Sequence, residues 1–323
     1  MQVVVTGGAG FIGRRLVRQL LHQGTLLGLD GRPRSIERIT IIDAAEADDL
    51  TDPRLEHVVG DISDTGVINA AINPDTSAIF HLAAVVSGMA EADFALGMRI
   101  NVDASRLILE ACRHAGHGPR LVFASSVAVY GGAPSDRMHD STAPTPRTSY
   151  GTQKAMVELL INDYSRRGYV DGRVLRLPTI SVRPGRPNAA ASSFASGIIR
   201  EPLNGEPAVC PVDPETTLLL LSPSGVVGCM IHGHDLPAEA FGGNRVVNLP
   251  GLSVTVREMV RSLERVAGPE VVSRIRWEPD ARIAKFVANW PGAWDNSRAL
   301  ALGFPGDQSF EDNIRQYVAE QSH

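Results

Sequence analysis

A glycine-rich turn close to the N-terminus constrains the fold more than any other feature of this sequence. It reads TGGAGFIG over residues 6–13, so its glycines have the spacing G-x-x-G-x-x-G. The apolar run Val3–Val5 directly precedes the turn, and the helix-length segment Phe11–Gln23 overlaps its end. Strand, glycine-rich turn and helix in this order predict the first unit of a parallel α/β sheet that binds a dinucleotide.

Each glycine of the turn has a separate expected role. Gly7 permits a tight turn, Gly10 lets the backbone approach a pyrophosphate, and Gly13 permits close packing of the helix on the strand. The first helical turn, which includes Phe11 and Ile12, offers free backbone N–H groups to the anion. A turn that only joins a strand to a helix is the alternative, but the position of the motif favours the phosphate cradle.

Short apolar runs continue to alternate with helix-length segments as far as Pro178. The runs are nearly continuous, which is typical of strands covered by helices on both faces. We therefore predict a Rossmann-type, doubly wound parallel sheet in residues 1–178 and a smaller, mainly substrate-binding lobe in residues 179–323. The expected strands are Val3–Val5, Ile39–Ile42, His57–Val59, Ala78–Leu82, Leu121–Ala124 and Val174–Leu177, and the expected helices are Phe11–Gln23, Asp64–Ile72, Glu91–Ala115 and Tyr150–Arg167.

Three segments of the second half have recognisable patterns. Residues 228–235 are interpreted as a strand that returns to the sheet, and Arg245–Leu249 as a strand of the lobe. Val254–Val266 has the spacing of an amphipathic helix, and Ser253 is its expected N-cap. The lobe and the sheet are therefore expected to interleave along the chain.

Composition and charge argue against several functional classes. The 323 residues carry a net charge of −5 without a long block of like charge, which argues against a nucleic-acid partner. No apolar run approaches the roughly 18 residues that a membrane span needs, and no signal-peptide pattern precedes the first strand. We therefore expect a cytoplasmic protein without a membrane partner. Cys112, Cys210 and Cys229 lack C-x-x-C spacing, and His232 and His234 would point to opposite faces of a strand, so no metal site is expected.

An acidic residue after the second strand is expected to bind the adenosine ribose. Asp43 and Asp30 both follow apolar runs, and Asp43 is preferred because its run is longer and better bounded. This choice favours NAD over NADP. Arg14 or Arg15 could instead contact a 2′-phosphate, although arginines in a first helical turn are more often solvated. Asp61, after the third strand, is a candidate acceptor for the adenine amino group or an ordinary surface residue.

A tyrosine and a lysine lie four residues apart on one predicted helix face, at Tyr150 and Lys154. To act as a base near neutral pH, the tyrosine needs its pKa lowered by about 2–3, or roughly 3–4 kcal/mol, and a lysine cation is a suitable cause. An isolated Y-x-x-x-K is more often structural. Ser125 and Ser126 end a predicted strand, where a hydroxyl faces the cofactor crevice. Ser126 could then contact the substrate oxygen and Ser125 the nicotinamide, or both could cap a turn.

Taken together, the motifs resemble the extended short-chain dehydrogenase/reductase family, whose members include NAD-dependent epimerases and dehydratases. Each motif is weak alone, but they occur in one order and cover most of the chain. They are the glycines of residues 7–13, Asp61, FHLAA at 80–84, Asn101, Ser126, Tyr130-Gly131, Tyr150, Lys154, RLP at 176–178 and MIHGHD at 230–235.

The resemblance implies an NAD-dependent oxidoreductase in which Tyr150 is the catalytic base. Lys154 would lower the pKa of that tyrosine and bind the nicotinamide ribose, Ser126 would polarise the substrate oxygen, and Asn101 would support the helix behind Lys154. Arg14 departs from the small polar residue usual after the third glycine. Members of the family often form homodimers through two packed helices. The implied cofactor positions are Gly7, Gly10, Phe11, Ile12, Gly13, Asp43, Asp61, Ile62, Leu82, Ala83, Ala84, Asn101, Tyr150, Lys154 and Pro178.

The segment TISVRPGRPN at residues 179–188 is similar to a subgroup that oxidises a four-carbon sugar acid at C2. Arg183 or Arg186 could clamp a carboxylate, although either could equally form a surface ion pair. The reaction expected is removal of the C2 hydroxyl proton by Tyr150 as hydride leaves C2 for NAD. An epimerase that returns the hydride and a non-catalytic dinucleotide sensor are the alternatives. The expected substrate contacts are Ser87, Ser126, Tyr150, Thr179, Arg183, Arg186 and Asn188.

Overall fold

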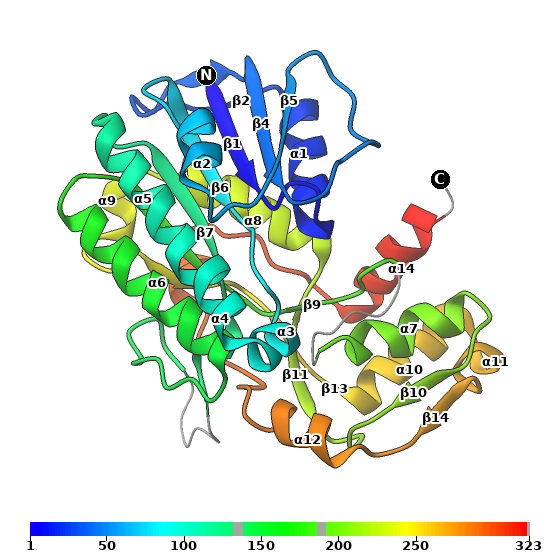
Figure 1. Ribbon diagram of the computed structural model, residues 1–323. Helices are drawn as coiled ribbons and strands as arrows, with labels where there is room; N and C mark the ends of the chain where they lie inside the picture. Colours follow the sequence, from blue (N-terminus) through cyan, green and yellow to red (C-terminus); the bar gives the residue numbers. More distant parts are fainter. Residues whose placement is uncertain (132–137, 186–191, 322–323) are drawn as a thin grey trace.

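A seven-stranded parallel sheet forms the centre of the molecule (Figure 1). The computed structural model describes residues 1–131, 138–185 and 192–321. The strand order is β12-β8-β7-β6-β1-β4-β5, and every neighbouring pair is parallel. The predicted doubly wound sheet is therefore confirmed. Its strands are β1 (Gln2–Thr6), β4 (Arg38–Asp43), β5 (Leu55–Val59), β6 (Thr76–His81), β7 (Arg120–Ser126), β8 (Asp171–Leu177) and β12 (Val246–Asn248).

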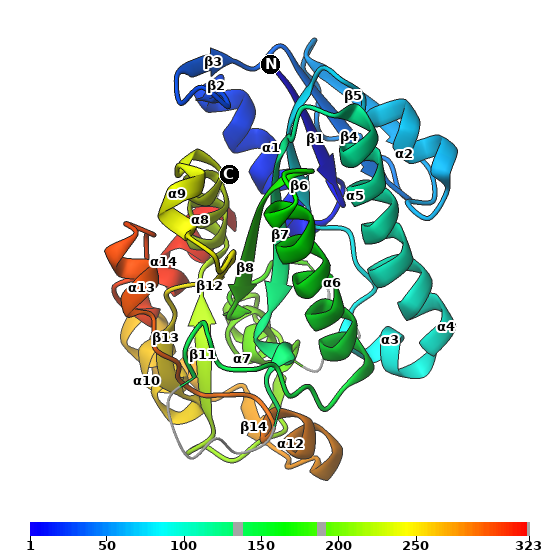
Figure 2. The ribbon, with the colours of Figure 1, turned by 90° about the vertical axis from the view of Figure 1, so that its left-hand side faces the viewer.

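Helices cover both faces of the sheet, which explains why its central strands are apolar on both sides (Figure 2). Val3 and Val5 of β1 pack toward one helical layer, and Val4 between them packs toward the other. Neither these helices nor any other in the described ranges has the length and apolarity to cross a membrane. One layer contains α1 (Phe11–Gln23) and α8 (Pro223–Asp235), and the other contains α2 (Thr65–Ala71), α5 (Ala104–Ala115) and α6 (Ser149–Arg166).

The sheet has its topological switch at β1, whose two neighbours are β4 and β6. The chain adds β4 and β5 on one side and then crosses over to add β6, β7 and β8 on the other. Loops that leave the carboxyl ends of β1 and β6 therefore diverge and open a crevice. Between α1 and β4 the chain forms a small antiparallel hairpin, β2 (Thr25–Leu27) and β3 (Pro33–Ser35), which stands apart from the main sheet.

The single helix expected over Glu91–Ala115 is broken into several pieces. Asp93 separates the first two because its side chain accepts a hydrogen bond from Leu96 N and so starts a new helix. A π-helical turn follows before the regular helix α5, and such turns are frequent at functional sites. The pieces are α3 (Ser87–Ala92), α4 (Phe94–Gly97), the π-helical turn η1 (Met98–Asp103) and α5.

The expected returning strand at residues 228–235 is wrong, because this segment belongs to helix α8. Its buried residues include positions 226, 229, 230, 233 and 234, which have the spacing of one helix face. Ser222 caps the helix by accepting a hydrogen bond from Gly225 N, and Pro223 occupies its first turn. The strand that returns to the sheet is β12, within the segment Arg245–Leu249 that was expected to lie in the lobe.

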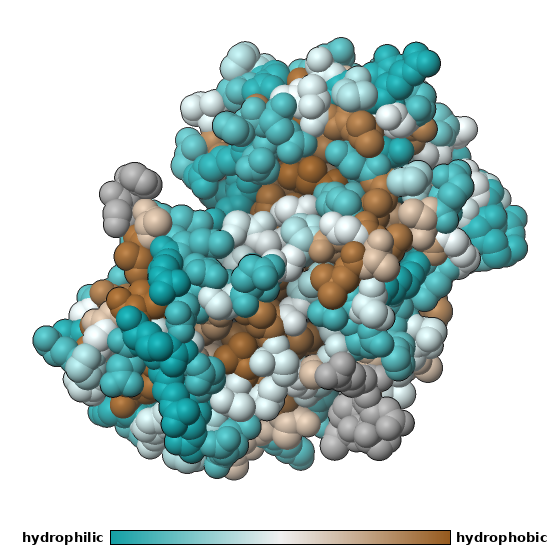
Figure 3. Space-filling view, turned by 180° about the vertical axis from the view of Figure 1, so that it is seen from behind, coloured by the Kyte–Doolittle hydropathy of each residue, from teal (hydrophilic) through white to brown (hydrophobic). Residues whose placement is uncertain are grey.

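The lobe lies beyond the carboxyl ends of the strands and has its own hydrophobic core (Figure 1). Apolar residues gather along the middle of the rear face, between the upper and lower halves of the molecule (Figure 3). The elements of the lobe are β9 (Thr179–Ile180), α7 (Phe194–Leu203), β10 (Ala208–Cys210), β11 (Thr217–Leu221), β13 (Leu252–Thr255), α10 (Val256–Ala267), α11 (Pro269–Val272), β14 (Ile275–Trp277), α12 (Ala281–Val287) and α14 (Phe310–Gln321). The short helices α9 (Ala238–Phe241) and α13 (Ser297–Ala301) lie beside β12.

The amphipathic helix of the lobe begins at Val256, and its cap is Thr255 rather than Ser253. The Thr255 hydroxyl accepts a hydrogen bond from Glu258 N. Ser253 instead belongs to β13, and its hydroxyl donates to the carbonyl oxygen of Gly292. Residues 252–255 form the strand β13, which was not predicted, and it delays the start of the helix and moves the cap by two residues.

Candidate active site

A cavity of about 350 Å³ opens at the carboxyl ends of β1, β6 and β7, between the sheet and the lobe. It brings together the glycine-rich turn, the predicted catalytic residues and part of the predicted substrate segment. The residues that line it are Gly7, Gly10, Phe11, Ile12, Gly13, Leu82, Ala84, Val86, Ser87, Ala124, Ser125, Ser126, Val127, Ala128, Tyr150, Lys154, Leu177, Pro178, Thr179, Ile180, Arg183, Ser192 and Trp290.

The glycine-rich turn has the geometry of a phosphate cradle. Gly7 has a φ of 71°, and a Cβ atom there would lie 2.7 Å from the backbone nitrogen of Ala83. A Cβ atom at Gly13 would lie 2.2 Å from the carbonyl oxygen of Gly7. Gly10 is the N-cap of α1 and has no side chain to accept the N–H groups of the first turn, which leaves them for an anion. The turn therefore fits the pyrophosphate of NAD.

The two candidate ribose ligands lie in different places. Asp43 ends β4, beside the turn, and accepts hydrogen bonds from Ala9 N at 3.0 Å and Ala45 N at 3.2 Å. Asp30 lies in the β2–β3 hairpin and pairs with Arg34. Only the first position follows a strand of the main sheet next to β1, where a dinucleotide ribose lies in this fold. The choice of Asp43 as the ribose ligand stays a prediction.

Asp61 follows β5 at the same edge of the sheet but does not line the cavity. Its carboxylate accepts hydrogen bonds from the backbone and side chain of Ser63 and forms an ion pair with Arg99. The bonds from Ser63 and then Arg99 lower the pKa of Asp61 to about 2. Ile62 is buried in the core beside it. A role for Asp61 and Ile62 toward the adenine stays a prediction.

Asn101 lies in the π-helical turn, behind the cavity wall rather than in it. Its amide accepts a hydrogen bond from Val85 N at 2.8 Å and donates to Val85 O at 3.1 Å. It also donates to Gln153 Oε1 at 2.7 Å, on the helix that carries Lys154. The buried Asn101 side chain thus joins the loop after β6 to α6. Ala83 on that loop packs against Gly7, so the loop also forms one side of the turn.

His81, which the sequence did not single out, links the glycine-rich turn to the same π-helical turn. Its Nδ1 atom is 2.7 Å from Thr6 Oγ1, and its Nε2 atom is 2.8 Å from Ser105 Oγ. The Ser105 hydroxyl donates in turn to the carbonyl oxygen of Asn101 at 2.7 Å. Burial, and then the charge of Lys154, lower the pKa of His81 to about 3, so the ring is neutral.

Three residues of α6, each one turn after the last, contact the last three residues of β7. Lys154 donates from Nζ to Ala124 O at 2.9 Å, and Glu158 accepts a hydrogen bond from Ser125 Oγ at 2.5 Å. The pairs are Tyr150 with Ser126, Lys154 with Ala124, and Glu158 with Ser125. The Ser125 hydroxyl is therefore directed toward Glu158, whereas the sequence suggested a place near the nicotinamide.

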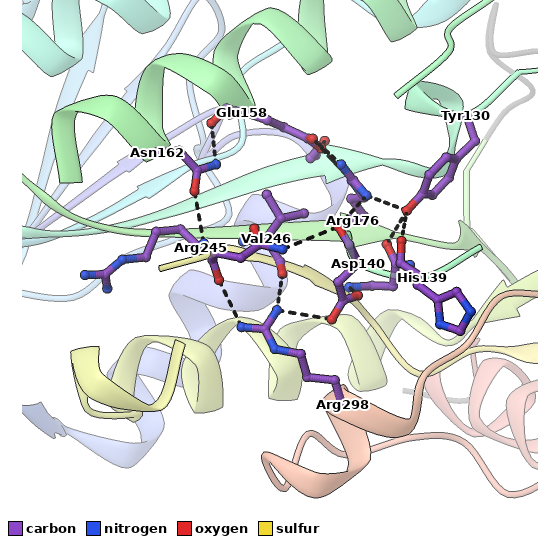
Figure 4. Close-up of polar contacts among 12 residues, drawn as sticks. Tyr130, His139, Asp140, Glu158, Asn162, Arg176, Arg245, Val246 and Arg298 are labelled. Atoms are coloured by element: carbon purple, nitrogen blue, oxygen red, sulfur yellow. Dashed lines mark hydrogen bonds and ion pairs between the residues drawn. The ribbon is translucent and has the colours of Figure 1, made fainter. Parts of the chain in front are cut away.

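A buried polar network behind these pairs fixes Glu158 (Figure 4). Arg176 of β8 donates to both carboxylate oxygens of Glu158, from Nε at 2.9 Å and from a terminal nitrogen at 2.6 Å. The same guanidinium donates to the Tyr130 hydroxyl, which donates to His139 O at 2.9 Å. These partners come from distant segments, so Glu158 carried no functional signal in the sequence and Arg176 carried none beyond its place in the RLP motif.

The electrostatics of Tyr150 and Lys154, the predicted catalytic pair, differ from the expectation. Burial raises the pKa of Tyr150 to about 12. Among the described residues, the groups that oppose this rise are Ser126, through a hydrogen bond, and Arg183, through its charge, whereas we expected that effect from Lys154. Burial lowers the pKa of Lys154 to about 7, and the charge of Glu158 acts in the opposite direction.

The lobe contributes a cation to the cavity. A terminal nitrogen of Arg183 donates to Ser192 Oγ at 3.0 Å, and its backbone nitrogen donates to Ser196 Oγ at 3.0 Å. Burial and the nearby charge of Arg200 lower the pKa of Arg183. Arg183 thus shares one cavity with Ser87, Ser126, Tyr150 and Thr179, all of them predicted substrate contacts. The other two predicted contacts, Arg186 and Asn188, lie outside the described residues.

Trp290, which also lines the cavity, had no signal in the sequence. It follows α12, and its backbone nitrogen donates to Val287 O at 3.0 Å. Its side chain is partly buried and packs against the core of the lobe. A tryptophan after a short helix forms part of no motif, so only the fold brings it to this wall.

The two histidines of α8 have structural partners. His232 Nε2 is 2.8 Å from Leu302 O, and His234 Nδ1 is 2.8 Å from Asp235 Oδ1. They lie on a helix, so the argument from strand faces does not apply to them. Across the described ranges, no three or more His, Cys, Asp or Glu side chains are grouped to hold a metal ion.

Comparisons with known proteins show which family the chain belongs to. A family model described as the NAD dependent epimerase/dehydratase family matches residues 3–218. The chain is 59% identical over 320 residues to D-erythronate dehydrogenase of Cupriavidus necator, covering 99% of this chain and 98% of the relative. It is 47% identical over 319 residues to D-erythronate dehydrogenase of Haemophilus influenzae, covering 98% and 99%.

A solved structure is similar over the whole fold. It is described as the nucleoside-diphosphate-sugar epimerase from Agrobacterium tumefaciens, and it matches with a TM-score of 0.93 at 41% identity. The match covers 100% of this chain and 94% of that one. The resemblance in the motifs is thereby confirmed, and the chain belongs to the NAD-dependent epimerase/dehydratase family.

Proposed function

We propose that this enzyme oxidises D-erythronate, a four-carbon sugar acid, at C2 to 2-dehydro-D-erythronate. The observation that carries the proposal is that Arg183 lies in the same cavity as Tyr150 and Ser126. A guanidinium is well suited to a carboxylate, and C2 of a sugar acid is the carbon next to that group. Two relatives that the chain matches over nearly their full length are dehydrogenases named for this substrate.

In this mechanism Tyr150 accepts the proton of the C2 hydroxyl while Ser126 donates a hydrogen bond to the same oxygen. NAD, when bound, accepts the hydride from C2. Because burial raises the pKa of Tyr150 to about 12, the positive charges around it must favour the phenolate. Arg183 supplies one such charge. Lys154 would supply a second charge when it is protonated. Its Nζ atom donates to Ala124 O at 2.9 Å, and its proposed role is to bind the ribose of the nicotinamide.

A nucleotide-sugar epimerase is the second candidate, favoured by the description of the Agrobacterium structure. It would use the same tyrosine but return the hydride, so NADH would not accumulate. The test is a screen of C3–C6 sugar acids and UDP-sugars against the purified chain with NAD and with NADP, read as NADH or NADPH absorbance and as product by chromatography. Oxidation of D-erythronate is expected. Conversion of a UDP-sugar without oxidation of any acid would overturn the proposal.

Tyr150→Phe separates catalysis from dinucleotide binding. The variant is expected to bind NAD and to lose turnover by a factor of 10² or more, since general-base catalysis typically contributes about 10²–10⁴-fold. A protein that only senses a dinucleotide would show the same behaviour with tyrosine and with phenylalanine at this position.

We further infer a homodimer formed through the helical layer that contains α6. Met89, Phe94, Met156 and Leu159 lie on α3, α4 and α6, and each exposes at least 38% of its surface. Exposed apolar residues gathered on one side are typical of an interface. Leu159→Glu should convert the dimer to a monomer in light scattering. The NAD dependence and the three free, buried cysteines also fit a cytoplasmic enzyme.

A further inference from the structure

Arg14, the first residue after the glycine-rich turn, is held by three groups at once. Its Nε atom donates to Ala9 O at 2.6 Å, and a terminal nitrogen donates to Glu46 O at 3.1 Å. The other terminal nitrogen forms an ion pair with Asp49. Asp49 also pairs with Arg18, one turn further along α1. Asp49, on the loop after β4, therefore neutralises two arginines of α1.

The ion pair lies next to the position expected for the adenosine ribose. Ala9 accepts a hydrogen bond from Arg14 through its carbonyl oxygen and donates one to Asp43 through its nitrogen. The Arg14 guanidinium and the Asp43 carboxylate thus flank a single residue of the turn. A ribose held by Asp43 would present its 2′ oxygen to this region, which is where NAD carries a hydroxyl and NADP a phosphate.

The charges here disfavour a phosphate in two ways. Asp43 would repel it directly, and the nearest cation, Arg14, is already bonded to Ala9, Glu46 and Asp49. An arginine engages a phosphate best when its N–H groups are free to form paired hydrogen bonds. The side chains of Arg14 and Asp49 are 28% and 43% exposed, so a phosphate could reach the guanidinium if the carboxylate were removed.

We propose that Asp49 is a specificity-determining residue for the cofactor. It keeps Arg14 and Arg18 neutralised, so that the adenosine end of the site accepts the 2′-hydroxyl of NAD and rejects the 2′-phosphate of NADP. This proposal rests on the dinucleotide site but not on the identity of the substrate.

The test measures binding of NAD and NADP by isothermal titration calorimetry, with no substrate present. Asp49→Asn should tighten the Kd for NADP about 2- to 5-fold and change the Kd for NAD less than about twofold, a range typical of exposed charge pairs. Raising the ionic strength should reduce the gain, because exposed charges are screened. Asp49→Asn with Arg14→Met should show no gain, since the cation that binds the phosphate is then absent.

Asp52→Asn is the matched control. Asp52 lies on the same loop and loses the same charge, but it pairs with Arg54 and not with Arg14. If Asp52→Asn tightens NADP binding as much as Asp49→Asn does, a general change in charge explains the effect and the proposal is wrong. The proposal is also wrong if Asp49→Asn leaves the NADP-to-NAD ratio of Kd unchanged while circular dichroism shows a folded protein.

Discussion

Removing one partner of the buried Glu158–Arg176 pair should destabilise the protein strongly. Both side chains are 2% exposed, so Arg176→Met would leave a carboxylate buried without its cation. Breaking such a pair typically costs about 3–5 kcal/mol of unfolding free energy. The double variant Glu158→Leu, Arg176→Met removes both charges and leaves the hydroxyls of Ser125 and Tyr130 without these partners. At about 1 kcal/mol for each hydroxyl, the double variant should lose only about 2 kcal/mol.

The assay is equilibrium urea unfolding at neutral pH, followed by circular dichroism, of the wild type, both single variants and the double variant. Each single variant is expected to be less stable than the double variant, which gives a coupling energy of about 4 kcal/mol or more between the two positions. A cycle in which the two single losses simply add would refute the reasoning. A loss of less than about 1 kcal/mol of unfolding free energy for Arg176→Met would also refute it, because the Glu158 carboxylate would then be hydrated in the folded protein.

Three further predictions concern pH and substrate. Burial lowers the pKa of His81 from 6.5 to about 3. As the pH falls, the unfolded chain therefore takes up a proton that the folded chain does not, and the unfolding free energy should fall by about 2 kcal/mol between about pH 8 and pH 5. His81→Asn should flatten this part of a pH–stability profile measured by urea unfolding, and an unchanged slope would contradict the prediction. Arg183→Met should raise the KM for the sugar acid about 30- to 150-fold, and Arg183→Lys should restore only part of the loss. The affinity for NAD, measured by titration, should stay unchanged in both variants. An equal loss of NAD binding would show a disrupted fold instead. Trp290→Ala should raise the kcat/KM of six-carbon acids relative to four-carbon acids about tenfold, and a constant ratio would show that Trp290 does not limit chain length.

The parts of the fold that depend on local pattern could be predicted from the sequence. Glycine spacing, apolar runs and the Tyr150–Lys154 interval are properties of a few neighbouring residues. The apolar runs form the strands of the sheet, and the glycine-rich turn and the Tyr150–Lys154 pair lie together at its carboxyl edge. The segment 228–235 was misinterpreted because a short apolar run fits both a strand and a buried helix. The serine and proline at 222–223 were the signals that could have decided for the helix.

Other parts of the site depend on partners that are distant in sequence. Glu158 is one turn beyond Lys154, but its importance appears only when β8 brings Arg176 against it. Trp290 lines the cavity only because the lobe lies against the carboxyl ends of the strands. Thr255 and Ser253 are both ordinary caps by type, and the end of β13 decides between them. In each case the deciding contact joins segments that are far apart in the sequence, so a local sequence pattern cannot predict it.

The contacts between α6 and β7 fasten three successive turns of one helix to the end of one strand. Tyr150, Lys154 and Glu158 lie on one rigid rod, so a small slide of the helix would loosen all three pairs at once. A weakened contact at Glu158 would therefore also loosen the two pairs nearer the start of the helix, because one element carries all three side chains. A substitution two turns away from the phenol could then disturb the residue proposed as the base without touching it.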